Sequence, residues 1–168
     1  MIAGLMFTYG ILTSSDSSAQ GRRQDTSGKR IQELLTASGF ELQLYEVVPD
    51  EQAMLEARLR TWADKNRLDL IVTTGSTGLT ARDVMPEATR TVIDWEVPGI
   101  AEAMRTQTFQ HTPLAMISRA VVGVRGRTLI VNLPGSPKAV QQCLDVVLPV
   151  LPHALEMLQE YPPSHGPA

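Results

Sequence analysis

Stretches of apolar residues alternate with polar segments along the chain, and three of them predict strands. Residues 2–12 form an apolar run that ends in the hydroxyl-rich segment 13–21, so we expect a strand followed by a polar loop. Residues 41–48 alternate between apolar and polar side chains, which is typical of a half-buried strand. Residues 68–75 (LDLIVTTG) are apolar enough to form a central strand that is buried on both faces.

Helical spacing of apolar residues lies between these strands. Within residues 25–40 the spacing predicts a helix with Asp25 or Thr26 as its N-cap and Gly39 at its end. Residues 49–66 show a second amphipathic helical pattern. The alternation of strand and helix indicates βαβ units and a parallel sheet with right-handed crossovers.

The second half of the chain predicts two short helices and a hairpin. Pro86 occupies a favoured first helical position in segment 86–95, and residues 98–109 form another short helical pattern. Two apolar strands lie within residues 118–135, and Gly126 between them indicates a tight hairpin turn.

A longer helical pattern follows in residues 134–158. Ser136 is its expected N-cap and Pro137 its first helical residue. Pro149 and Pro152 are expected to kink or divide the helix, because proline cannot donate the backbone hydrogen bond that a helix interior needs.

Together these elements predict one domain over residues 1–160 and a loose tail at residues 161–168. The expected fold class is α/β: three layers, with a mainly parallel sheet, helices on both faces and a small β-hairpin element. In such open sheets, ligands usually bind at the carboxyl ends of the strands, near a switch in strand order.

Composition and charge narrow the class of protein. The chain has 168 residues, 43% of them apolar, and a net charge of −3 at pH 7, which favours a water-soluble domain over a broad nucleic-acid binder. Cys143 is the only cysteine, so no internal disulfide is possible and a cytoplasmic setting is expected. The apolar N-terminal run lacks a preceding positive charge and is too short to span a bilayer, so we expect neither a secretory signal nor a membrane span.

The segment TTGSTGLTARD, residues 73–83, combines glycines and hydroxyl side chains directly after the predicted central strand. It matches neither the Walker A loop nor the dinucleotide fingerprint. Backbone N–H groups of a glycine-containing turn can still cradle a phosphate. The alternative is that Gly75 and Gly78 only supply turn conformations that other residues resist.

Two aspartates follow predicted strands, Asp50 in VVPDE and Asp83 in TARDV. Carboxylate oxygens are the ligands that Mg²⁺ prefers when it also bridges nucleotide phosphates. Arg82 beside Asp83 offers a guanidinium that can pair with a phosphate through two hydrogen bonds. Both aspartates can also serve as plain helix N-caps, which for Asp50 taken alone is the better interpretation, and Arg82 can be a surface charge.

The segment NLPGSPK, residues 132–138, places a second glycine-containing turn at the start of a helix, where unpaired N–H groups favour an anion. An ordinary helix start explains it equally well. We expect segments 13–18, 73–83 and 134–137 at one end of the sheet. The remaining reactive side chains show no catalytic pattern: Ser118 has no Ser-His-Asp arrangement around it, the histidines lack metal-ligand spacing, and Cys143 falls on an apolar helix face.

Considered jointly, these motifs resemble a known family. The segments SSDSSAQGRRQDTSG, VVPDE, TTGSTGLTARDVMPEAT and AMISRAVVGVRGRTLIVNLPGSPKAV occur in the order seen in molybdenum-cofactor biosynthesis proteins of Mog and MoaB type, and in the related gephyrin and plant Cnx G domains. The resemblance covers residues 5–158. It implies a trimer that binds ATP and molybdopterin and uses Mg²⁺ to adenylylate molybdopterin, giving a product that a molybdate-inserting enzyme consumes.

The resemblance also implies roles for single residues. The family's functional aspartates fall on Asp50 and Asp83, which would hold Mg²⁺, and its pterin-site serine falls on Ser118. One departure is Ser76, which stands where members usually have glycine. The ligand-contacting segments correspond to Thr13, Ser14, Asp16 and Ser17; to Thr74, Gly75, Ser76, Thr77, Gly78 and Arg82; and to Pro134, Gly135, Ser136 and Pro137.

Two other functions remain open from the sequence. Because a Cβ at Ser76 can crowd the loop or require an uncommon backbone conformation, the protein can be a molybdopterin carrier or scaffold without efficient adenylyl transfer. The competence-damage-inducible proteins carry a similar domain, so a nucleotide pyrophosphatase is the third interpretation.

Overall fold

The computed structural model describes residues 6–160, which form one six-stranded sheet covered by helices. The strands are β1 Thr8–Ser14, β2 Glu41–Val48, β3 Leu70–Thr74, β4 Trp95–Glu96, β5 Val122–Arg125 and β6 Thr128–Leu133. Their order is β2-β1-β3-β6-β5-β4. The first four in this order are parallel, whereas β5 is antiparallel to both of its neighbours. The predicted mainly parallel sheet with a small hairpin is confirmed.

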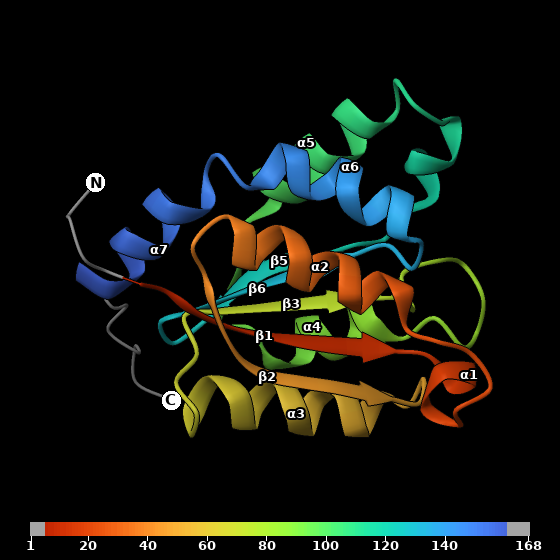
Figure 1. The fold of residues 1–168 in the computed structure, drawn as a ribbon, viewed down its shortest axis with the longest axis horizontal. Helices are drawn as coiled ribbons and strands as arrows, with labels where there is room; N and C mark the ends of the chain where they lie inside the picture. Colours follow the sequence, from red (N-terminus) through yellow and green to blue (C-terminus); the bar gives the residue numbers. More distant parts are fainter. Residues whose placement is uncertain (1–5, 161–168) are drawn as a thin grey trace.

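Helices cover both faces of the sheet, which gives the predicted three layers (Figure 1). One face carries α2, α5, α6 and α7, and the other carries α3 and α4. The helices are α1 Asp16–Ala19, α2 Thr26–Ala37, α3 Gln52–Asp64, α4 Met85–Val92, α5 Pro98–Thr108, α6 Pro137–Val147 and α7 Leu151–Glu160, with a 3₁₀ turn, η1, at Pro113–Ile117. None of the helices in the described part of the chain is long and apolar enough to span a membrane.

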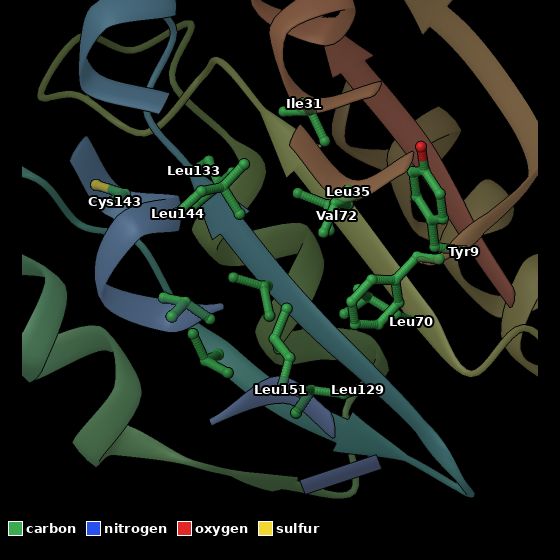
Figure 2. Packing of buried hydrophobic residues seen from close by; sticks show 14 of the residues in the cluster. Tyr9, Ile31, Leu35, Leu70, Val72, Leu129, Leu133, Cys143, Leu144 and Leu151 are labelled. Carbon is green, nitrogen blue, oxygen red and sulfur yellow. The ribbon is translucent and has the colours of Figure 1, made fainter. Parts of the chain in front are cut away.

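Alternating side chains of the central strand divide the core in two. Leu70 and Val72 of β3 lie in the cluster with α2, α5, α6 and α7 (Figure 2), and Ile71 between them lies in the cluster with α3 and α4. Every residue of β3 is buried, as the apolar run predicts. Burial of such side chains on both faces is the main favourable contribution to folding and holds the strand ends in fixed positions.

Proline and glycine act largely as the sequence predicts. Ser136 caps α6 by accepting a hydrogen bond from the backbone N–H of Ala139 at 3.2 Å, and Pro137 is the first residue of α6. Pro149 lies in the break between α6 and α7, so the long helical pattern is divided. Gly126 takes a φ of 57° in the two-residue hairpin turn between β5 and β6.

Three local predictions need correction, and two short elements were not predicted. The first strand begins at Thr8, and residues 2–5 of the predicted strand lie outside the described residues, as does the predicted tail 161–168. The expected loop 13–21 contains the last residues of β1 and the short helix α1. Pro86 is the second residue of α4, because the helix begins at Met85. Strand β4 and the turn η1 were not predicted.

Candidate functional site

The site lies where the strand order switches direction. Strand β1 is flanked by β2 on one side and by β3 on the other, so the chain turns in opposite directions after β1 and after β2. Because β1, β3 and β6 are parallel, the segments that follow them meet at the carboxyl end of the sheet, where α1 lies (Figure 1). The expectation that segments 13–18, 73–83 and 134–137 share one end is confirmed. Open α/β sheets bind ligands at this carboxyl end of their strands.

Asp50 is tied to the segment after β1 and does not cap α3. The N-cap of α3 is Glu51, which makes no capping side-chain bond. Ser14 donates its hydroxyl to Asp50 Oδ1 at 2.6 Å, and the backbone N–H of Asp16 donates to Asp50 Oδ2 at 3.2 Å. The N–H of Asp50 in turn donates to Asp16 Oδ1 at 3.0 Å. The helix-cap interpretation of Asp50 is therefore wrong, and each of the two aspartate side chains accepts a hydrogen bond from the backbone N–H of the other.

Arg82 joins the segment after β3 to this pair. Its Nη2 lies 2.7 Å from Asp16 Oδ2 and 2.8 Å from Asp16 Oδ1, and its Nε lies 3.1 Å from Asp16 Oδ2. The bonds from Arg82, followed by the bond from the backbone of Asp50, hold the pKa of Asp16 below its ordinary value. Arg82 is therefore more than a free surface charge, since it fastens two loops across the site.

The glycine-containing turn takes an unusual backbone path at Gly75 and Ser76. Gly75 has a φ of 89°, and a Cβ there would lie 2.3 Å from the carbonyl oxygen of Ser14, so only glycine fits. Ser76 has a φ of 58° although it is not glycine. Its hydroxyl accepts from the N–H of Val84 at 2.8 Å and donates to the carbonyl of Arg82 at 3.1 Å. Gly78, in contrast, does not have a positive φ.

The side chain of Asp83 points back toward the loop that precedes it and is hydrogen-bonded there. Its Oδ2 accepts from the N–H of Thr80 at 2.8 Å and from the Thr80 hydroxyl at 2.7 Å, while Val84 is the N-cap of α4 and makes no capping side-chain bond. Burial acts to raise the pKa of Asp83, but the bonds from Thr80 and the Gly78 backbone, with the charge of Arg119, outweigh it. The pKa of Asp83 is thus lowered and the carboxylate is ionised at neutral pH.

No single metal cluster is formed by the predicted ligands. Among residues 6–160 there is no group of three or more His, Cys, Asp or Glu side chains placed to hold one ion. Asp50 is hydrogen-bonded to Asp16. Asp83 lies in the loop after β3, and Arg82 of that loop binds Asp16. The sequence prediction that Asp50 and Asp83 share an Mg²⁺ ion stays a prediction.

A polar cavity of about 130 Å³ opens beside the ends of β1 and β3. Its wall includes Thr74 and Gly75, as expected, and also Asp25 at the start of α2. The Asp25 carboxylate accepts from the Thr13 hydroxyl and the Tyr45 hydroxyl, both at 2.6 Å. Asp25 is the helix N-cap that the sequence predicts, but its place in the wall of this cavity is not visible in the sequence. The other lining residues are Thr13, Ser14, Ser15, Ser18, Arg23, Gln24, Thr26, Ser27 and Gly135.

A second cavity of about 230 Å³ lies between α5, η1 and α6. Ser118 lines it, so the predicted pterin-site serine is not in the polar cavity but next to it. Arg105 is the charged residue of this wall, and its Nη1 donates to the carbonyl of Ala120 at 3.0 Å. The sequence gives no signal that distinguishes Arg105 from an ordinary exposed arginine on a helix. The remaining wall includes Met104, Ala115, Ala139 and Cys143.

One turn contributes to both cavities. Gly135 lines the polar cavity, whereas its neighbours Pro134 and Ser136 line the second. The turn is anchored to the end of β3, because the Thr74 hydroxyl donates to the carbonyl of Pro134 at 2.7 Å. Among the other predicted residues, the hydroxyl of Ser17 lies within α1, 3.2 Å from that of Ser15, and the carbonyl of Thr77 accepts from the N–H of Arg119 at 3.0 Å.

Comparison with known proteins agrees with this arrangement. Residues 10–153 match the family described as "Probable molybdopterin binding domain". The molybdopterin adenylyltransferase of Helicobacter pylori strain J99 is 40% identical over 152 residues, covering 89% of this chain and 86% of that protein. The same identity over 152 residues is found with the molybdenum cofactor synthesis protein cinnamon of Drosophila melanogaster, of which the chain spans 25%. The crystal structure of the molybdopterin biosynthesis enzyme MoaB from Thermus thermophilus is 55% identical, with a TM-score of 0.88 and coverage of 94% of this chain and 99% of that one.

The fold and the site define an α/β protein with two cavities at the carboxyl ends of its parallel strands. Within that class, the match over most of the chain is decisive. The chain belongs to the molybdenum-cofactor biosynthesis family of Mog and MoaB type.

Proposed function

We propose that the protein is a molybdopterin adenylyltransferase of molybdenum-cofactor biosynthesis, which uses ATP and Mg²⁺ to form adenylyl-molybdopterin and pyrophosphate. The observation that carries the proposal is the shared turn at residues 134–136, whose successive residues line two different cavities. A polar cavity next to a glycine-containing turn suits phosphate, and a larger, mostly apolar cavity with a few polar groups suits a flat ring system. Two substrates bound in these cavities meet at the turn.

In the proposed reaction, an oxygen of the terminal phosphate of molybdopterin attacks the α-phosphorus of ATP. The new oxygen–phosphorus bond forms as the bond to pyrophosphate breaks, so no protein nucleophile is needed. Ser118 orients the pterin, and the polar cavity beside Gly75 holds a phosphate. Catalysis then comes mainly from positioning and from electrostatic stabilisation.

The carboxylates fit the chemistry of a magnesium site. Asp83 is ionised at neutral pH because its pKa is lowered, and Asp16 and Asp50 lie in mutual hydrogen-bond contact. We assign Asp50 and Asp83 as the residues that hold Mg²⁺, which supplies positive charge against the phosphates when it is bound. Arg82 has a carboxylate partner in Asp16 and exchanges it for a phosphate oxygen when the nucleotide enters.

The test is pyrophosphate release by the purified protein with molybdopterin, ATP and Mg²⁺, with identification of the nucleotide product by mass spectrometry. Release that requires all three components is expected. The positive φ of Ser76 in the loop favours a second candidate, a carrier or scaffold module. Molybdopterin binding without pyrophosphate release would support that candidate and contradict adenylyl transfer.

We further propose a cytoplasmic homotrimer that passes its product to a molybdate-inserting enzyme. Support for self-association comes from large apolar side chains exposed on and near η1, namely Phe109, Leu114, Met116 and Ile117. Support for the downstream partner comes from the longer relative in which this domain is only one part of the chain. Light scattering during size-exclusion chromatography tests the trimer directly, and a monomeric mass would contradict it.

A further inference from the structure

Arg119 connects the two sides of the site, although no sequence motif singles it out. It directly follows Ser118, yet its side chain reaches the loop after β3. Its Nε donates to the carbonyl of Gly78 and its Nη2 to the carbonyl of Asp83, both at 2.7 Å. Its Nη1 lies 2.5 Å from Glu87 Oε1 of α4. One guanidinium therefore binds both ends of segment 78–83 and the helix that follows it.

These contacts fix the orientation of Asp83. Its carbonyl is held by Arg119, its N–H donates to the carbonyl of Thr80 at 3.0 Å, and its carboxylate accepts from Thr80. A guanidinium presents its donors in a rigid planar fork, so it constrains several acceptors at once, which the single ammonium of lysine does not do. The peptide planes at both ends of the loop are thus set by one side chain.

The backbone around Arg119 is itself held from two sides. The N–H of Arg119 donates to the carbonyl of Thr77 at 3.0 Å. Arg105 of α5 holds the carbonyls of Ser118, at 3.4 Å, and of Ala120, at 3.0 Å, which are the two neighbours of Arg119. The chain from Ser118 to Ala120 therefore lies between the wall of the second cavity and the loop that carries Asp83.

We infer that Arg119 is a positioning residue that holds the loop 78–83, and with it the Asp83 carboxylate, in a fixed place relative to Ser118. One side chain thereby couples the nucleotide side of the site to the pterin side. The identity of the two ligands rests on the proposed function, whereas the coupling of the loop to Ser118 rests on the contacts alone. Because small displacements of reacting groups lower rates strongly, loss of this coupling is expected to reduce kcat more than it changes KM.

The test compares Arg119→Met and Arg119→Lys with Arg125→Met as the matched control. Arg125 also binds a carboxylate, Asp64, through Nε and Nη2 and a carbonyl, that of Val92, through Nη1. It is the last residue of β5, next to the hairpin turn before β6, and so lies at the end of the sheet opposite the cavities. Amide hydrogen exchange of the loop and steady-state pyrophosphate release are measured for all three variants and the wild type.

In Arg119→Met, exchange of the Thr80 and Asp83 amides is expected to rise about tenfold, because opening of the loop no longer breaks the Arg119 bonds. A fall in kcat of about tenfold, with KM for molybdopterin nearly unchanged, is expected for the same variant. Arg119→Lys should restore only part of both, and Arg125→Met should leave both at wild-type values. Melting temperatures of all variants show how much general destabilisation contributes.

Unchanged loop exchange in Arg119→Met overturns the inference, as does an equal rise in Arg125→Met. Faster loop exchange with wild-type kcat also overturns it, since the loop order would then have no effect on the reaction. A wild-type protein that releases no pyrophosphate contradicts the proposed function instead, and the exchange comparison still decides whether Arg119 orders the loop.

Discussion

Ser76 shows how one residue can depart from a local rule and compensate for it with its side chain. A non-glycine residue at a φ of 58° is strained, and such positions cost about 1–3 kcal/mol each. The Ser76 hydroxyl bonds to Val84 and Arg82, and its carbonyl accepts from the N–H of Met85 at 3.1 Å. Serine therefore closes the loop with two hydroxyl bonds that glycine cannot make.

Replacement of Ser76 by alanine and by glycine separates the two contributions. Ser76→Ala keeps the strain and loses both hydroxyl bonds, so it is expected to lower the free energy of unfolding by about 2 kcal/mol. Ser76→Gly loses the same bonds but relieves the strain, so its loss is expected to be smaller by about 1 kcal/mol. Urea denaturation of both variants measures the difference, and an alanine variant as stable as the glycine variant would contradict the strain.

At Asp83 the charge is expected to matter more than the shape. The asparagine side chain introduced by Asp83→Asn can still accept the bonds from Thr80, so the fold and molybdopterin binding should persist. Loss of the carboxylate charge is expected to lower Mg²⁺-dependent adenylyl transfer about a hundredfold. Single-turnover pyrophosphate release, with thermal melts as a folding control, gives the answer. Near-wild-type turnover would leave Asp83 a purely structural role.

At the scale of elements, the long regular elements are predicted by sequence, and β2 even to its ends, whereas the short pieces that surround the site are not. Strand β2 begins and ends at the predicted residues 41 and 48, because alternation over eight residues is a strong signal. Helix α1 has four residues and strand β4 has two, and neither is long enough to show a period. Their positions depend on tertiary contacts such as the bonds between Asp16 and Asp50.

The bridge between α1 and the loop after β3 should make stability depend on acid. The pKa of Asp16 is lowered from 3.8, chiefly by Arg82, so the ionised carboxylate favours the folded state. That contribution is fully present above the ordinary pKa and is lost as the pH falls through the lowered one. The wild type should therefore be more stable than Asp16→Asn at about pH 7, and the difference should shrink progressively as the pH falls below 3.8. A difference that is independent of pH, measured by urea midpoints, would show that the bridge contributes nothing.

At the scale of the whole molecule, the sheet edge brings distant segments together as predicted, but the partition into two cavities is not visible in the sequence. Because ligands bind at the carboxyl ends of parallel strands, the order of elements along the chain is enough to predict that the segments after β1, β3 and β6 form the site. Ser118 and Arg119 come from the irregular segment that follows η1, where no periodicity fixes which side chain points where. Only the packed structure shows that Ser118 lines the second cavity and not the polar cavity.

Separate cavities predict separable binding. Ser118→Ala is expected to weaken molybdopterin binding about tenfold, as loss of one hydrogen bond does, and to leave ATP affinity unchanged. Isothermal titration with each ligand alone measures both affinities. Weaker ATP binding with intact molybdopterin binding would mean that the two cavities hold the opposite ligands.

The position of Cys143 offers a built-in chemical reporter of one cavity. Its thiol is the only one in the chain, it is almost fully buried on α6, and it lines the same wall as Ser118 (Figure 2 shows its place in the core). Burial raises the pKa of this thiol to about 11, so alkylation is slow at neutral pH and becomes faster in alkali. A compound that fills the cavity shields the sulfur. The single mass increase left by a thiol reagent thus becomes a direct count of vacant cavities, obtained on the unaltered protein and without any turnover.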